Sequence, residues 1–208
     1  MTFSSSLRIT SRARARVPTM SKLFIIIGNS GAGKDTIIEE VHKKFPPQYR
    51  KLKIPKRVIT RQSSDTEKFE SVDKETFFKL RQSGEFILEW ESYQHFYGIR
   101  HEVQDWLNAG HPVIMNVSRK IVHIARDKFP DAKVIFIRVP LEVATDRIIE
   151  RGRESYKEVL DRVVRAQEHQ DYEGADLIVD NVGKFEETSQ KVLDYIVESL
   201  SKDYTLEP

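Results

Sequence analysis

The segment from Gly28 to Lys34 sets the strongest limit on how this chain can fold. It has the form G-x-x-x-x-G-K and lies between the apolar run Leu23 to Ile27 and an amphipathic segment. In this context the glycines let successive backbone N–H groups converge on a polyphosphate, and the lysine can reach the outer phosphates. A plain strand-to-helix turn would not require a lysine and three glycines in this spacing. We therefore predict a phosphate-binding loop made of Gly28, Asn29, Ser30, Gly31, Ala32, Gly33 and Lys34.

From Lys22 onward, short β-branched runs alternate with amphipathic segments. This alternation is typical of a mostly parallel sheet with helices on both faces, so we predict an α/β fold of three layers. We expect one domain over residues 21–208, because a chain of this length can bury a core of its own. The expected core strands are 23–27, 53–59, 112–116, 133–139 and 177–180, and the expected helices are 34–44, 103–109, 121–128, 141–150, 157–172 and 185–200.

The alternation breaks between Arg61 and Gly98. This stretch contains one helix pattern, Asp73 to Gln82, and one strand pattern, Phe86 to Trp90. It is too short for an independent domain. We expect residues 61–98 to form an insertion at the carboxyl ends of the core strands, where ligands bind in open α/β sheets.

The basic character of the chain comes from its first 20 residues. The formal net charge is +2, and four of the 34 Lys and Arg residues lie in this segment, which has no Asp or Glu. The other 30 face 32 acidic residues, so residues 21–208 carry a charge of −2 and charge does not support nucleic-acid binding. We interpret residues 1–20 as a disordered basic tail or as the product of an upstream start site, since Met20 directly precedes the first strand. Their composition also resembles a mitochondrial-type presequence.

Several classes of protein are excluded or disfavoured. The chain has no cysteine, so disulfide scaffolds and cysteine zinc sites are excluded. The longest apolar run, Leu23 to Ile27, is far shorter than the roughly 20 residues of a membrane helix. The first 20 residues also lack the apolar core of a secretory signal. We expect a cytoplasmic protein without a membrane or nucleic-acid partner, and the sequence does not indicate its oligomeric state.

Two positions depart from the usual phosphate-binding loop and its neighbouring strand. Lys34 is followed by Asp35 and Thr36, where Ser or Thr normally binds the magnesium of a nucleotide. The strand expected at 112–116 ends at Asn116, where kinases with this loop usually carry a metal-linked Asp. Together the two changes indicate that Asp35 supplies the carboxylate that the strand end lacks, with Thr36 as a second metal ligand. Alternatively, Asp35 is an ordinary acid in the first turn of a helix.

Arginines gather between residues 147 and 165. Arg147 and Arg151 are four residues apart and share a helix face, Arg153 follows, and Arg162 and Arg165 lie on the next predicted helix. Such a cluster can act as a lid that closes over a triphosphate and stabilises the transferring group, an effect worth about 10³-fold or more in rate. Helices of alternating charge can also be solvated surface. We predict a lid over residues 147–165.

These segments resemble the guanylate kinase group of nucleoside monophosphate kinases over residues 22–200. The matching pieces are the loop 28–34, Thr60-Arg61, Glu89-Trp90, Tyr97-Gly98, the arginine segment 147–153 with Arg162, and 176–181. Within that group the chain is most similar to the ribose 1,5-bisphosphate phosphokinases of phosphonate metabolism. The marks of that similarity are Gly33-Lys34-Asp35, Asn116 with Ser118-Arg119, Tyr97-Gly98 and the run 151–155.

The resemblance implies a P-loop kinase fold and an ATP- and Mg²⁺-dependent kinase that converts ribose 1,5-bisphosphate to 5-phosphoribosyl 1-diphosphate. The partner is then a small phosphorylated acceptor. The implied catalytic residues are Lys34, Arg147, Arg151 and Arg153. ATP would be bound by the loop together with Asp35, Thr36 and Asn181. The acceptor would be bound by Arg61, Glu89, Tyr97, Asn116, Ser118, Arg119 and Arg162.

Two alternatives remain open. Guanylate kinase activity, from GMP to GDP, is favoured by Glu89, which matches a guanine-contacting glutamate of that family. It is weakened by residues 62–69, which lack the glycines and tyrosine that guanylate kinases carry after their first acceptor arginine. Ser118 and Arg119 suit an acceptor phosphate better than a base. The second alternative, a non-catalytic guanylate-kinase-like binding module, has no need of Lys34 and the lid arginines.

Overall fold

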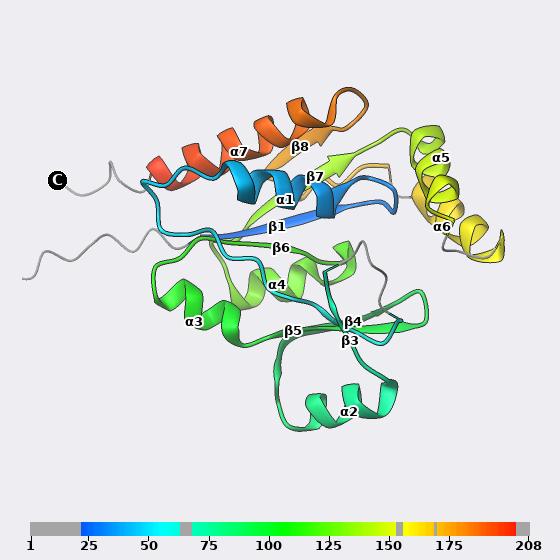
Figure 1. Ribbon diagram of the computed structural model, residues 1–208, viewed down its shortest axis with the longest axis horizontal. Helices are drawn as coiled ribbons and strands as arrows, with labels where there is room; N and C mark the ends of the chain where they lie inside the picture. Colours follow the sequence, from blue (N-terminus) through cyan, green and yellow to red (C-terminus); the bar gives the residue numbers. More distant parts are fainter. Residues whose placement is uncertain (1–21, 63–67, 153–155, 169, 203–208) are drawn as a thin grey trace, which may run out of the picture.

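Four parallel strands form the central sheet, in the order β6-β1-β7-β8 (Figure 1). The structure, a computed structural model, describes residues 22–62, 68–152, 156–168 and 170–202. The parallel arrangement confirms the sheet expected from the sequence. The strands are β1 (Leu23–Gly28), β6 (Val113–Asn116), β7 (Lys133–Arg138) and β8 (Leu177–Asp180).

The side chains of β1 alternate between two separate cores. Leu23, Ile25 and Ile27 pack on one face of the sheet, and Phe24 and Ile26 pack on the other. This follows from the two-residue period of a strand. Both faces of β1 are buried, which explains its continuous apolar run.

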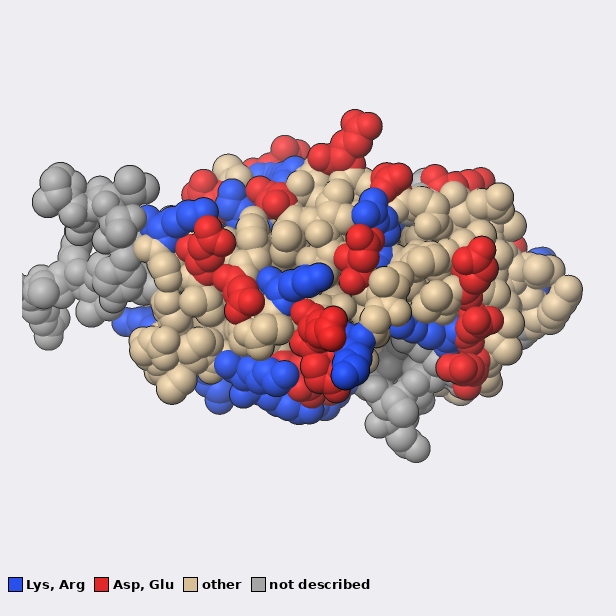
Figure 2. All heavy atoms as spheres, turned by 90° about the horizontal axis from the view of Figure 1, so that it is seen from above, with Lys and Arg blue, Asp and Glu red and all other residues tan. Residues whose placement is uncertain are grey.

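Helices cover both faces of the central sheet, giving the three layers expected (Figure 1). One face carries α1 (Lys34–Lys44) and α7 (Phe185–Lys202), and the other carries α3 (Glu102–Asn108) and α4 (Val122–Lys128), which follows a short 3₁₀ turn at Arg119–Ile121. On the side of α1 and α7, positive and negative side chains are interspersed (Figure 2). In the part of the chain that the structure describes, no helix is long and apolar enough to cross a membrane.

A second, smaller sheet lies beside the first, in the order β3-β2-β5-β4. Helix α2 packs against this sheet and begins after Asp73, whose carboxylate accepts a hydrogen bond from the Thr76 amide at 2.7 Å. Phe77 of α2 is fully buried and stacks on Phe86 of the sheet at 4.8 Å between ring centroids. The elements of this region are β2 (Val58–Ile59), β3 (Glu70–Ser71), α2 (Lys74–Gln82), β4 (Phe86–Ser92) and β5 (His95–Arg100). The sequence predicted only the helix and one strand.

The prediction of a core strand over 53–59 is wrong. Lys53 forms a single parallel bridge to Val113, and only Val58 and Ile59 form a strand, which pairs antiparallel with β5 in the second sheet. Pro55 explains the break, because proline has no N–H to donate to a ladder. The segment therefore leads the chain from the central sheet into the smaller one.

The remaining differences concern ends of elements. Helix α5 (Leu141–Arg151) ends at Gly152, whose φ of 61° suits a glycine. Helix α6 (Tyr156–Glu168) ends earlier than the predicted helix 157–172. Residues 1–20, interpreted as a tail, lie outside the described residues.

Candidate active site

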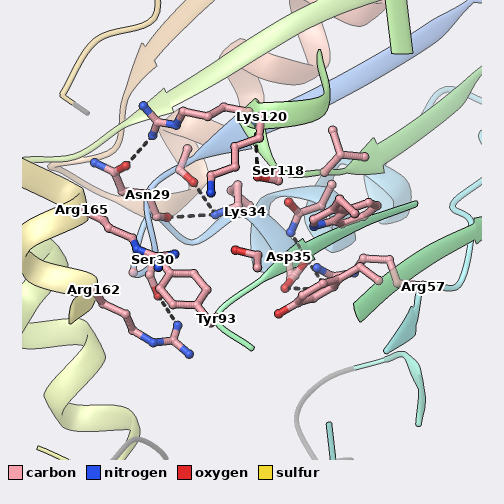
Figure 3. Close-up of a pocket in the computed structure, with 18 of the residues that line it drawn as sticks. Asn29, Ser30, Lys34, Asp35, Arg57, Tyr93, Ser118, Lys120, Arg162 and Arg165 are labelled. Atoms are coloured by element: carbon pink, nitrogen blue, oxygen red, sulfur yellow. Dashed lines mark hydrogen bonds and ion pairs between the residues drawn. The ribbon is translucent and has the colours of Figure 1, made fainter. Parts of the chain in front are cut away.

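A cleft opens where the carboxyl ends of β1 and β6 face the second sheet and α6 (Figure 3). The phosphate-binding loop forms its base. One wall comes from the end of β6 and the residues after it, a second from β2, β4 and β5, and a third from α6. This is the place at which the sequence predicted ligand binding.

The loop requires its glycines. Gly31 and Gly33 have φ values of 80° and 79°, a region that residues with a side chain rarely adopt. A Cβ added at Gly31 would lie 2.5 Å from the carbonyl oxygen of Ala144, and one at Gly33 would lie 2.9 Å from the side-chain nitrogen (Nδ2) of Asn181. Helix α1 begins directly after Gly33 without a side-chain cap, so its first N–H groups face the base of the cleft.

Lys34 lies over the loop. Its Nζ donates hydrogen bonds to the carbonyl oxygens of Gly28 and Asn29, both at 2.9 Å. Both residues line the cleft with it. The ammonium group is therefore held at the base of the cleft, where a polyphosphate bound by the loop would meet it.

Asn181 and Arg147 support the loop from behind. The Asn181 side chain is 1% exposed, donates to the carbonyl oxygen of Ala32 at 2.9 Å and accepts from the Thr188 hydroxyl at 3.1 Å. Arg147 donates to the carbonyl oxygens of Gly31 and Asn181, both at 3.3 Å. Asn181 was expected to contact the nucleotide and Arg147 to form the lid. In the structure both contact the loop, and neither is among the described residues that line the cleft, so their roles toward the nucleotide stay predictions.

Asp35 contacts two residues across the cleft. Arg57 lies 3.2 Å from its Oδ2, and the Asn116 amide donates to its Oδ1 at 2.8 Å (Figure 3). Burial raises the pKa of the Asp35 carboxyl, but Arg57 and Asn116 outweigh this, with help from Lys34, and hold it below its usual value. Asp35 is therefore ionised at neutral pH. Thr36 also lines the cleft, and Arg57 was not predicted, although the sequence has this cation just before the Thr60-Arg61 pair.

The second sheet contributes an aromatic and cationic wall. Tyr97 stacks on Trp90 with 5.1 Å between ring centroids and 7° between the planes. Burial raises the pKa of the Tyr97 hydroxyl, and Arg61 and Arg57 partly offset that rise. The phenol is therefore a hydrogen-bond donor at neutral pH. The Arg61 guanidinium lies 5.1 Å from the ring of Phe69 and lines the same cleft.

The wall after β6 carries further cations. Arg119 donates to the side-chain oxygen of Asn29 and lies 5.5 Å from the ring of Phe136. Ser118 caps the 3₁₀ turn by accepting from the Lys120 amide at 3.4 Å. Ser118, Arg119 and Lys120 all line the cleft, so the structure brings the predicted Ser118 and Arg119 together with the loop.

Glu89 does not face the cleft, and the expectation that it binds substrate is not supported. Its carboxylate accepts from Arg81 of α2 at 2.7 Å, on the opposite face of β4 from Trp90. A bulge explains this direction, because the pairing of β4 with β5 shifts between Phe86 and Leu88. The extra residue reverses the alternation that would otherwise turn Glu89 toward the cleft.

Helix α6, which lies within the predicted lid, forms one side of the cleft. Arg162 donates to the Ser30 hydroxyl of the loop at 2.7 Å, and Asn29 donates to the carbonyl oxygen of Ala166 at 3.2 Å. Arg162 and Arg165 both lie against the ring of Tyr93, a residue that the sequence analysis missed. Arg151 is the last residue of α5, and Arg153 lies outside the described residues.

Positive charge dominates the cleft. Among the described residues that line it, only Asp35 is acidic. No group of three or more His, Asp or Glu side chains suited to a metal ion occurs within the described ranges. This composition suits a site for two polyanions, in which phosphate oxygens supply most ligands of any magnesium ion. The basic lining residues are Lys34, Arg57, Arg61, Arg119, Lys120, Arg162 and Arg165.

Comparisons with known proteins agree with this geometry. The guanylate kinase family model matches residues 20–199. A protein named ribose 1,5-bisphosphate phosphokinase PhnN from Rhizobium etli is 35% identical over 82% of this chain and 87% of its own length. A protein of the same name from Janthinobacterium is 35% identical over 88% of this chain, but the chain covers only 40% of that longer protein.

The fold is also found in a solved structure. The guanylate kinase from Anaplasma phagocytophilum has a TM-score of 0.66 to this chain, with 19% identity, and the match covers 86% of each. At this identity the similarity concerns the fold, and it confirms the P-loop kinase architecture predicted from the sequence. The chain therefore belongs to the guanylate kinase family of kinases, and within it to the group named ribose 1,5-bisphosphate phosphokinase.

Proposed function

We propose that this kinase transfers the γ-phosphoryl group of ATP to the 1-phosphate of ribose 1,5-bisphosphate, giving 5-phosphoribosyl 1-diphosphate and ADP. The observation that carries the proposal is a cleft with a phosphate-binding loop at its base and cations on each of its walls. Relatives that bear the name of this activity support the choice of acceptor.

The reaction needs positioning more than acid–base chemistry. An oxygen of the 1-phosphate attacks the γ-phosphorus as the bond to the β,γ-bridging oxygen breaks, and the bridging oxygen leaves with ADP. The attacking oxygen is already an anion, so no general base is required. The enzyme must instead bring two polyanions together, and the excess of arginine and lysine in the cleft serves this purpose.

ATP would be held by the loop, with Lys34 at its outer phosphates. Asp35 and Thr36 offer hard oxygen ligands beside them, which fits a magnesium ion that keeps several waters and binds mainly to phosphate. When bound, magnesium would neutralise charge on the β- and γ-phosphates. Arg57 and Asn116 keep the Asp35 carboxylate ionised and oriented toward the cleft.

The acceptor carries two phosphates, and the cleft offers two groups of cations to receive them. Arg57 and Arg61 lie on the wall of the second sheet beside Tyr97, whose hydroxyl can donate to a phosphate oxygen. Arg119 and Lys120 lie on the wall after β6. We assign these two groups to the two ends of the pentose bisphosphate, with the lid arginines of α6 over the transferring phosphoryl group.

Phosphorylation of GMP is the competing function, and the match to the guanylate kinase model favours it. Against it, Glu89 is engaged with Arg81 and turned from the cleft, so one polar contact to a guanine is missing. A role as a binding module without catalysis is a weaker candidate, because Lys34 and Arg162 both remain in contact with the loop.

The test is an assay of ADP release with ribose 1,5-bisphosphate, with GMP and with no acceptor. Phosphorus NMR should show, beside the signals of ADP, a second diphosphate, and we expect this second diphosphate only with the pentose bisphosphate and not with GMP. Lys34→Ala serves as the control, since it should lower the rate by about a hundredfold or more while circular dichroism stays as in the wild type. GDP formation as the faster reaction would replace the proposed acceptor, and full activity of Lys34→Ala would remove the kinase mechanism.

A further inference from the structure

The turn between β4 and β5 has an unusual backbone for its residues. Ser92 pairs with His95, so the turn consists of Tyr93 and Gln94, whose φ values are 50° and 63°. A two-residue hairpin of this kind strongly favours Asn-Gly or Gly-Gly. A bulky side chain in the left-handed region is a backbone outlier, and such outliers concentrate at functional sites.

The Tyr93 side chain links the second sheet to the lid. Its ring lies 4.7 Å from the Arg162 guanidinium and 4.5 Å from that of Arg165, and both arginines belong to α6 (Figure 3). Arg162 also donates to Ser30 of the phosphate-binding loop at 2.7 Å. All four residues line the cleft. Tyr93 thus lies where the hairpin of the second sheet, the arginines of α6 and the phosphate-binding loop come together.

A ring suits this position for an electrostatic reason. Arg162 and Arg165 are three residues apart on one helix face, so their like charges repel. A carboxylate could hold them, but it would cancel charge that a transferring phosphoryl group needs. The face of an aromatic ring attracts a guanidinium through its quadrupole and leaves the positive charge intact.

We propose that Tyr93 is a positioning residue that holds Arg162 and Arg165 at the cleft, where their charges act on the transferring phosphoryl group. The proposal rests on the proposed function, because it assigns these arginines to phosphoryl transfer. It explains why a tyrosine occupies a turn position that its backbone disfavours. It also makes the lid depend on the hairpin of the acceptor wall, so the two sides of the cleft act together.

The test compares three variants. Tyr93→Asn removes the ring and suits the left-handed backbone, so the melting temperature should stay the same or rise. Its kcat should nevertheless fall about tenfold, the size expected for losing two cation–π contacts. Tyr93→Phe keeps the ring and should retain kcat within about twofold. Gln94→Gly is the matched control, because it relieves the same turn beside an intact ring and should leave kcat unchanged.

Each result decides the proposal. A Tyr93→Asn enzyme with wild-type kcat would overturn it, as would an equal loss in Gln94→Gly, which would assign the effect to the turn backbone. An equal loss in Tyr93→Phe would assign the effect to the hydroxyl and also overturn it. The wild type in the same assay separates the proposed acceptor from the role of Tyr93. If the wild type phosphorylates only GMP, the proposed function fails. The variants at Tyr93 are then compared with GMP as the acceptor, and this comparison still tests the role of Tyr93.

Discussion

At the scale of single residues, Asp35 and Asn116, the two positions at which the chain departs from the usual phosphate-binding loop and its neighbouring strand, are in direct contact. The 2.8 Å hydrogen bond between them means that the carboxylate of this loop and the amide of the strand end occupy one site. Exchanging their side-chain types would move the charge by only a short distance. The hypothesis that Asp35 carries the magnesium function can therefore be tested by exchange as well as by removal.

We expect Asp35→Asn to raise the magnesium concentration needed for the half-maximal rate, because an amide is a weaker ligand for a hard cation than a carboxylate. Asp35→Ser should also be impaired, whereas Asp35→Ser with Asn116→Asp should recover part of the activity, a coupling that a double-mutant cycle measures. Calorimetric titration of magnesium–ADP provides a readout independent of turnover. Unchanged magnesium dependence in Asp35→Asn would leave this residue an ordinary acid of the first helical turn.

Arg57 should control the pH dependence through the same carboxylate. Burial alone would raise the pKa of Asp35, and Arg57 is the main influence that lowers it. Because the folded-state pKa lies below the unfolded one, the ionised group stabilises the fold above the unfolded pKa, and this stability is lost as the pH falls through the folded pKa. In Arg57→Gln the acid limb of the kcat/KM profile should move to higher pH. A profile that stays in place would show that Asp35 ionisation does not limit activity.

At the scale of elements, the sequence predicted the central sheet well and the second sheet poorly. Strands β1, β6 and β7 of the central sheet are buried on both faces and form continuous apolar runs, so their residues alone indicate strands. The strands of the second sheet depend on pairing. Val58–Ile59 is too short to give a pattern. In β5, Gly98 interrupts the side-chain pattern of the sequence, and any Cβ there would meet the ring of Phe86 at 2.5 Å.

The direction of the Glu89 side chain likewise depends on strand pairing, which the sequence pattern does not reveal. The register shift between Phe86 and Leu88 lets two successive residues, Ile87 and Leu88, pack into one core, and every later side chain of β4 changes face. A sequence pattern does not reveal such a shift, because the partner strand determines it. The place of the loop residues at the cleft could be predicted because a local motif defines the loop, whereas Arg57 and Tyr93 reach the cleft through contacts between distant elements.

The loop should depend on the end of β8 for its stability. Asn181→Ala removes the hydrogen bonds to Ala32 and Thr188 inside a buried site, so we expect a loss of about 1–3 kcal/mol in the free energy of unfolding. The affinity for ADP should fall as well, because the loop loses a support. Urea unfolding and calorimetry measure the two effects. Thr188→Val is the milder control, since it keeps the bond to Ala32, and an Asn181→Ala protein as stable as the wild type would contradict this account.

At the scale of the whole molecule, binding depends on local charge and not on net charge. Residues 21–208 carry a formal charge of −2, and positive and negative side chains are mixed on the face of α1 and α7 (Figure 2). Of the described residues that line the cleft, the charged ones are nevertheless all basic except Asp35. A phosphorylated substrate is therefore attracted by the walls of one cleft, and its attraction should weaken as salt rises.

Because the charge of the cleft and not the net charge attracts the substrates, the effect of removing residues 1–19 can be predicted. The segment contributes Arg8, Arg12, Arg14 and Arg16 and no acid, but it offers no apolar face to bury and lies outside residues 20–199, which match the family model. Truncation should therefore leave kcat and the melting temperature unchanged at physiological salt. Kinetics and thermal unfolding of both forms test this. A fall of several degrees in the melting temperature would mean that the segment packs on the kinase fold, and a lower kcat/KM that disappears at high salt would mean that its arginines help to attract the substrates.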